Sequence, residues 1–125
     1  MALNYTLKLS KRQLETIQRA AELYMRVQMG QFPYIAEIFM GDPQVNIGEL
    51  KDLLYALGRS PEGRKLQRQT RPHKADMAYD IYQVIRHKLA WERNPKGGMT
   101  VDFDTPMCTS GEDLPEIIRN TDVLK

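Results

Sequence analysis

Arginine, histidine, amide and tyrosine side chains share the polar face of the longest helix that the sequence predicts, over residues 74–94. At 100° per residue, one half of this helix collects Tyr79, Gln83, Arg86, His87 and Asn94. Arginine can bind a phosphate through two parallel hydrogen bonds, and an amide can pair with an adenine edge. The set therefore fits one wall of a nucleotide site. It fits equally well a solvated helix face with a structural histidine.

Further candidate residues stand beside this face or on other elements. Tyr82 and Trp91 offer planes on which a base can stack, and Arg26 of the first predicted helix offers a second cation for phosphate. Asp102 and Asp104 are two positions apart in a predicted strand, so they share one face of it. Paired carboxylates there can bind ribose hydroxyls or a cation, although a polar outer strand face explains them as simply.

The sequence contains no pattern typical of a catalytic centre. It has no P-loop, no glycine-rich dinucleotide fingerprint and no GxSxG. The histidines His73 and His87 lack the spacing of metal ligands, and the single Cys108 cannot build a zinc site. We therefore predict no catalytic residue, no metal site and no cofactor, and we expect a protein that is not an enzyme.

The composition is that of an ordinary globular domain. The chain has 125 residues, of which 42% are hydrophobic and 27% charged. Residues 1–10 lack the apolar stretch of a signal peptide, and no apolar run approaches the ~18 residues of a membrane span. Because a single cysteine also fits a reducing compartment, we expect one cytoplasmic domain, residues 1–125, without membrane contact.

The charges are distributed unevenly along the chain. Residues 59–74 hold six Lys/Arg and one acid, whereas residues 101–125 hold six acids and two bases, in a chain of net charge +2. We predict a basic loop over 59–74, rich in proline and poor in aliphatic residues, and an extended C-terminal arm over 104–125. The loop and the arm can pair within or between subunits, or the loop can bind phosphates.

Hydrophobic periodicity predicts three helices before the basic loop. The first begins after Ser10, which has Gln13 at the capping-box position, and ends at Gly30. Its inward face is predicted to hold Leu14, Ile17, Ala21, Tyr24, Met25 and Val27. A short helix follows at 31–40, and a third begins after Asn46 and ends at Gly58.

Alternating apolar residues at 3–9 and 99–103 predict two strands that pair as an antiparallel ribbon. We therefore predict an α+β fold that is mostly helical, with about four helices around the long central helix and this short ribbon. The apolar half of the central helix is wider than one neighbour can cover, so we also predict a homo-oligomer, a dimer or larger.

Four segments carry a resemblance to a known group of proteins. MGQF (29–32), AYDIYQVIRHKLAW (78–91), NPKGG (94–98) and TVDFDTP (100–106) resemble small phage and prophage proteins. The similarity covers most of the chain from residue 10 onward. The chain is similar to phage counter-defence proteins that sequester cyclic nucleotide signals, such as the Thoeris anti-defence sponges.

This resemblance implies a non-catalytic, oligomeric phage protein in the cytoplasm of the bacterial host. Such a protein encloses a cyclic nucleotide or cyclic ADP-ribose-type immune signal and keeps it from its effector. On that reading, Arg86, His87 or Arg26 meets the phosphates, Tyr82 or Trp91 stacks on a base, and an aspartate takes the ribose hydroxyls.

Two other classes of function stay open. A nucleic-acid-binding phage regulator would use the basic segment 59–74 to contact phosphates. A protein-binding inhibitor or structural protein would instead dock its acidic arm, residues 102–122, on a basic host surface. Steep salt dependence of DNA binding favours the first, and oligomerisation without nucleotide affinity favours the second.

Overall fold

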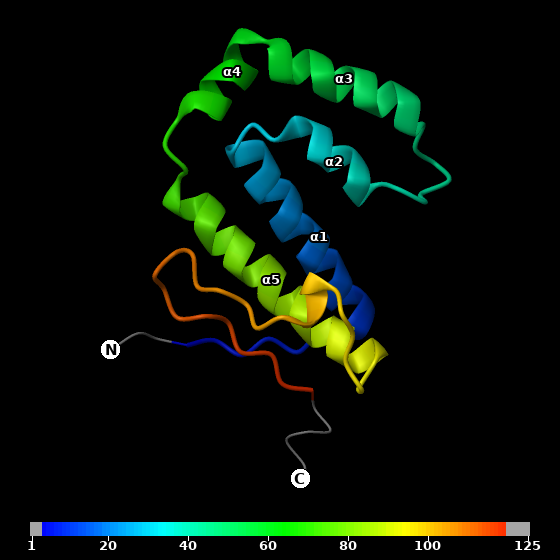
Figure 1. Ribbon diagram of the computed structural model, residues 1–125, viewed down its shortest axis with the longest axis vertical. Helices are drawn as coiled ribbons and strands as arrows, with labels where there is room; N and C mark the ends of the chain where they lie inside the picture. The colour runs from blue at the N-terminus through cyan, green and yellow to red at the C-terminus, as the bar shows by residue number, and fades with distance from the viewer. Residues whose placement is uncertain (1–3, 120–125) are drawn as a thin grey trace.

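The computed structural model describes residues 4–119, and over these residues it is helical, without a β-strand (Figure 1). Its elements are α1 (Lys11–Gln28), α2 (Phe32–Ile38), α3 (Ile47–Arg59), α4 (Pro61–Arg68), α5 (His73–Arg93) and the 3₁₀ turn η1 (Val101–Phe103). The predicted α+β class and its two-stranded ribbon are therefore wrong. No helix among the described residues is long and apolar enough to cross a membrane.

The predicted strand at 99–103 is replaced by η1 because its one large ring packs on α5. Phe103 meets Trp91 edge to face, with ring centroids 5.4 Å apart, while Met99 and Val101 stay exposed. Gly98 lies under the Phe103 ring, where any side chain would collide with it. Of the three alternating apolar residues at 99, 101 and 103, only Phe103 packs against a helix, so the alternation does not reflect a strand. In the other predicted strand, residue 3 lies outside the described residues and residues 4–9 are irregular.

Helices α1 and α5 form an antiparallel pair that makes the first part of the core. Met25, near the end of α1, packs against Ala75 and Ala78, near the start of α5. The two alanines are almost fully buried, and their small side chains allow the helices to approach closely. The predicted capping box starts α1, since Ser10 Oγ accepts from the Gln13 N–H and Gln13 Oε1 accepts from the Ser10 N–H.

A second core cluster lies between α2 and α3. Phe32, Ile35 and Ala36 of α2 pack against Leu54 of α3. Leu23 of α1 and Leu66 of α4 pack against the edges of this cluster. Helix α3 therefore lies alongside α2, on the side away from α5, and α4 follows it (Figure 1).

The segment 59–74, predicted as a loop, contains α4. Ser60 ends α3 and caps α4, because its Oγ accepts from the Gly63 N–H at 3.0 Å and donates to the Leu57 oxygen at 2.6 Å. Pro61 then occupies the first turn, where its missing N–H costs nothing. Serine followed by proline is a typical start of a helix. The two prolines and the glycine within these sixteen residues nevertheless favoured a loop in the sequence-based prediction.

The C-terminal arm folds back antiparallel along α5. Its described residues, to 119, form no helix or strand after η1. Phe103 contacts Trp91 near the end of α5, Thr109 binds Asp80 in the middle, and Glu112 lies 3.5 Å from His73 at the start. The arm therefore covers one side of α5 over most of its length (Figure 1). The rest of the predicted arm, 120–125, lies outside the described residues.

Candidate functional site

Five polar side chains from α1, α5 and η1 gather where the two long helices lie side by side. We call this group the arginine–tyrosine cluster: Glu22, Arg26, Tyr82, Arg86 and Asp102. Arg26 lies 3.5 Å from Glu22, and Arg86 lies 3.4 Å from Asp102. The arginine side chains are 21% and 22% exposed, so each guanidinium is partly shielded yet reachable from solvent.

Tyrosine rings support both guanidinium groups. Arg86 Cζ lies 5.3 Å from the centre of the Tyr82 ring, and Arg26 Cζ lies 4.9 Å from that of Tyr34 on α2. Tyr79 stacks against Tyr82 with ring centroids 6.2 Å apart. A guanidinium held over a ring keeps its N–H edges available to acceptors. The rings thus hold two cations in place. Arg26 Nη1 donates to Gln31 Oε1 and Arg26 Nη2 faces Glu22, so an oxyanion that binds this arginine through two bonds must displace one of these partners.

The environment of Tyr82 keeps its phenol protonated. Burial raises the pKa of Tyr82 above its usual value of 10, and the Glu22 carboxylate raises it further. A hydrogen bond and the charge of Arg86, with a smaller effect of Arg26, oppose this shift without cancelling it. At neutral pH, Tyr82 is therefore a hydrogen-bond donor and not a general base.

Three buried donors in or beside this cluster have no hydrogen-bond partner among the described residues. They are Nε of Arg26, Nε of Arg86 and Nε2 of Gln83. Gln83 is only 8% exposed and stands one helical turn from Tyr79 and from Arg86. A buried donor without an acceptor carries a desolvation cost of about 1–3 kcal/mol. An acceptor that reached any of these nitrogens would recover that cost.

The formal charges within the cluster balance. Two carboxylates, Glu22 and Asp102, face two guanidinium groups at distances of about 3.5 Å. Long, partly exposed ion pairs of this kind contribute little, typically less than 1 kcal/mol. A phosphate, which carries more than one acceptor oxygen, can therefore compete with them for the arginines.

The other residues predicted as ligand contacts lie outside this cluster. His87 and Trp91 face the returning arm, with ring centroids 6.4 Å apart, and Trp91 Nε1 donates to the Phe103 oxygen at 3.3 Å. Asn94 Nδ2 donates to the Gly97 oxygen at 2.7 Å and so closes the turn after α5. Asp104 is exposed just after η1. Trp91 therefore contacts the segment that leads into the arm, and Asn94 stabilises the turn after α5.

Asp80, which was not predicted as a functional residue, holds the arm against α5. Asp80 is 3% exposed and accepts from the backbone N–H and the hydroxyl of both Thr109 and Ser110, at 2.6–3.1 Å. Burial raises the pKa of Asp80, but the four hydrogen bonds outweigh it, so the pKa lies below its ordinary value. An aspartate on a polar helix face gives no local signal of such a partner.

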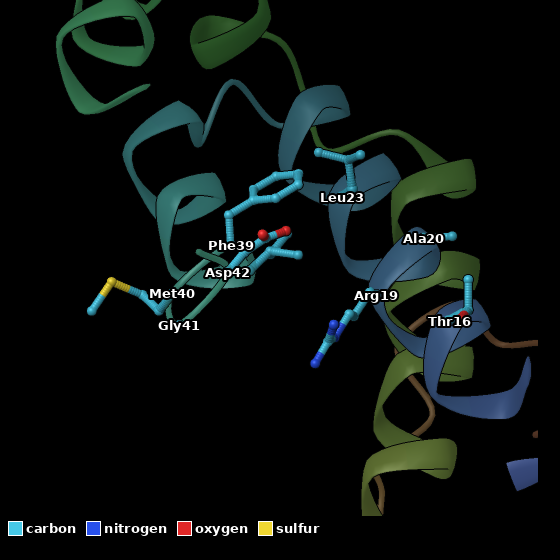
Figure 2. Close-up of a pocket in the computed structure, with 9 residues that line it drawn as sticks. Thr16, Arg19, Ala20, Leu23, Phe39, Met40, Gly41 and Asp42 are labelled. Atoms are coloured by element: carbon cyan, nitrogen blue, oxygen red, sulfur yellow. The ribbon is translucent and has the colours of Figure 1, made fainter. Parts of the chain in front are cut away.

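A groove opens between α1 and the end of α2 (Figure 2). Its volume is about 430 Å³, and it is lined by Thr16, Arg19, Ala20, Leu23, Ile38, Phe39, Met40, Gly41 and Asp42. None of the ligand contacts predicted from the sequence lies in it. Apolar side chains form much of its floor, and Arg19 and Asp42 stand at its opposite walls (Figure 2).

The groups that bear on metal and thiol chemistry among residues 4–119 are the His, Cys, Asp and Glu side chains, with Cys108 as the free thiol. No three His, Cys, Asp or Glu side chains there are placed to hold a metal ion. The exposed Cys108 donates its S–H to the Glu112 oxygen at 2.9 Å. The thiol thus forms part of the arm's own turn.

Comparisons of the chain with protein-family models, with curated proteins and with solved structures found no match.

Proposed function

We propose that the protein is a non-catalytic binding protein that captures a nucleotide-type phosphate ligand at the arginine–tyrosine cluster. The ligand class is that of the phage sponges it resembles: a cyclic nucleotide or cyclic ADP-ribose-type signal, which the protein would bind and withhold. One observation carries the proposal. Two partly shielded arginines on different helices each lie over a tyrosine ring, and both act on the phenol of Tyr82.

The chemistry of this cluster supports binding more than turnover. Phosphate oxygens would bridge Arg26 and Arg86, and the edge of Tyr79 or Tyr82 would meet a base or ribose. Gln83 offers one further donor to an acceptor that reaches its buried amide. Asp102, 3.4 Å from Arg86, would accept from a ribose hydroxyl once a phosphate replaces it as the partner of the guanidinium.

A thermal-shift screen against cyclic ADP-ribose isomers and cyclic di- and trinucleotides tests the proposal, because a ligand that binds only the native state raises the unfolding midpoint. We expect a shift with one of these classes and recovery of that ligand intact after denaturation. Recovery of a cleaved ligand would identify an enzyme. The absence of a shift with every compound would rule the proposal out.

A nucleic-acid-binding role is the second candidate, and α4 favours it. Arg64, Lys65 and Arg68 are exposed on this short helix, and Arg59 is exposed one residue before its cap. None of these four takes part in the ion pairs found among residues 4–119. If this surface binds DNA, affinity will fall steeply with salt, and neutralising Arg64, Lys65 and Arg68 will abolish it.

A further inference from the structure

One face of α1 carries apolar side chains that the described residues leave open to solvent. Tyr24 is 45% exposed, Val27 is 39% exposed, and Ala20 is exposed as well. The sequence pattern placed Tyr24 and Val27 in the inward face, but α5 contacts α1 around Met25 and α2 contacts it around Leu23. The sector between these two contacts stays uncovered.

The open face has the spacing of a helix-pairing seam. Steps of four, three, four and three residues join its members, Gln13, Ile17, Ala20, Tyr24 and Val27. Every charged residue of α1 lies about 60° or more around the helix from this seam: Lys11, Arg12, Glu15, Arg19, Glu22 and Arg26. An uncharged face does not suit a nucleic acid or an anionic membrane surface. It suits another apolar helix.

The groove between α1 and α2 continues this face. Ala20 belongs to both the seam and the groove, and Leu23, Phe39 and Met40 extend the apolar surface beyond it (Figure 2). A second groove adjoins the other end and is lined by Leu9, Arg12, Gln13, Thr16 and Ile17. The apolar surface therefore follows α1 over most of its length.

The seam is complementary to itself in the antiparallel direction. A two-fold axis beside Ala20 places Ala20 against its own copy, Ile17 opposite Tyr24, and Gln13 opposite Val27. The smallest side chain thus falls at the crossing point, where the helices come closest, and the large ring of Tyr24 meets the aliphatic Ile17. No like charges oppose one another along the seam.

We propose that the protein forms a symmetric dimer in which this face of α1 packs antiparallel against the same face of a second copy. A two-fold axis makes both partners use the same patch, as a self-complementary seam requires. The seam and Arg26 lie on different sides of α1, so the dimer leaves the arginine–tyrosine cluster open. An experiment can therefore rule out the dimer without ruling out ligand binding at the cluster, and the reverse.

Sedimentation equilibrium of the full chain tests the dimer. We expect the mass of a dimer for the unchanged protein and that of a monomer for Ala20→Glu, which places a charge at the crossing point. Ala20 is exposed and glutamate is a good helix former, so the variant should keep the thermal midpoint of a folded protein. Leu53→Glu, at a 64% exposed position on α3, is the matched control and should remain a dimer.

Cysteine cross-linking then locates the interface. In a Cys108→Ser background, Ala20→Cys should form a disulfide-linked dimer on mild oxidation, because the two copies of residue 20 meet at the axis. Arg19→Cys, its neighbour off the seam, should cross-link far less. A monomer at all concentrations would overturn the proposal. So would a dimer that survives Ala20→Glu and gives no more cross-link at residue 20 than at residue 19.

Discussion

Thr109 donates two hydrogen bonds to the same oxygen of Asp80, although 29 positions of the chain separate the two residues. Its hydroxyl lies 2.6 Å and its backbone nitrogen 2.9 Å from Asp80 Oδ1. Ser110 makes the equivalent pair of bonds to Oδ2 at 2.6 and 3.1 Å. One carboxylate therefore fixes the path by which the arm returns along α5.

Removal of this carboxylate should release the arm. Asp80→Ala leaves two backbone N–H groups without their acceptor, so we expect a loss of about 1–3 kcal/mol in the free energy of unfolding. Denaturant titration measures the loss, and limited proteolysis should show faster cleavage within residues 104–119. Asp52→Ala, at an exposed aspartate on α3, is the control and should change neither. Equal cleavage of both variants would mean that the arm is held by other contacts.

The same carboxylate predicts a pH dependence of stability. Because the pKa of Asp80 is lower in the folded protein than its ordinary value of 3.8, the unfolded chain binds the proton more tightly. The stabilisation is complete above that ordinary value and is lost as the pH falls through the lower, folded pKa. The unchanged protein should have a larger free energy of unfolding than Asp80→Asn. This difference should be constant near neutral pH and should become smaller as the pH falls into the acid range. A gap that widened in acid would contradict the hydrogen-bonded carboxylate.

Tyr82 predicts a second pH dependence of stability, in which stability is lost as the pH rises. Its pKa is raised in the folded state, so the stabilisation is present below the ordinary value of 10 and is lost as the pH rises through the folded pKa. An ultraviolet titration of the folded protein should show one tyrosine ionising later than the rest. Tyr82→Phe should remove that late step, whereas Tyr5→Phe, at a 90% exposed position, should leave it in place.

The joint between α3 and α4 depends on a glycine. A Cβ at Gly63 would overlap the backbone oxygen of Leu57, which cannot move without breaking the end of α3. Gly63→Ala should therefore destabilise the protein, despite the general preference of helices for alanine. Gly48→Ala, near the start of α3 where the closest atom is 3.4 Å away, should stabilise it by about 0.5–1 kcal/mol. Thermal unfolding of both variants distinguishes crowding from helix propensity.

Local signals in the sequence predicted the long helices and their starts. Ser10 and Asn46 cap α1 and α3 through the hydrogen bonds that their spacing to Gln13 and Glu49 indicates. Ser60 before Pro61 is the same kind of signal and marks the start of α4. The low aliphatic content of residues 59–74 nevertheless led to the prediction of a loop. Such capping signals depend on residues three or four positions apart, which is why the sequence carries them.

The contacts that create the candidate site depend on residues far apart in the chain. Arg26 approaches Tyr82 only because Met25 packs on Ala75 and Ala78, which sets the register of α1 against α5. No periodicity within either helix specifies that register. Likewise, the apolar alternation at 99–103 indicated a strand, since nothing local shows that Phe103 packs on Trp91.

The geometry also changes which residues should matter for a ligand. The sequence pairs Arg86 with His87, but the structure turns Arg86 towards Tyr82 and His87 towards Trp91. Arg26→Gln with Arg86→Gln should therefore abolish nucleotide binding in calorimetry. The variant also loses the Arg26–Gln31 hydrogen bond and two long ion pairs, so we expect a lower thermal midpoint, and binding is measured well below that midpoint. His87→Gln should leave binding unchanged. If His87→Gln abolishes binding while the arginine variant retains it, the ligand lies on the arm side of α5 and not at the arginine–tyrosine cluster.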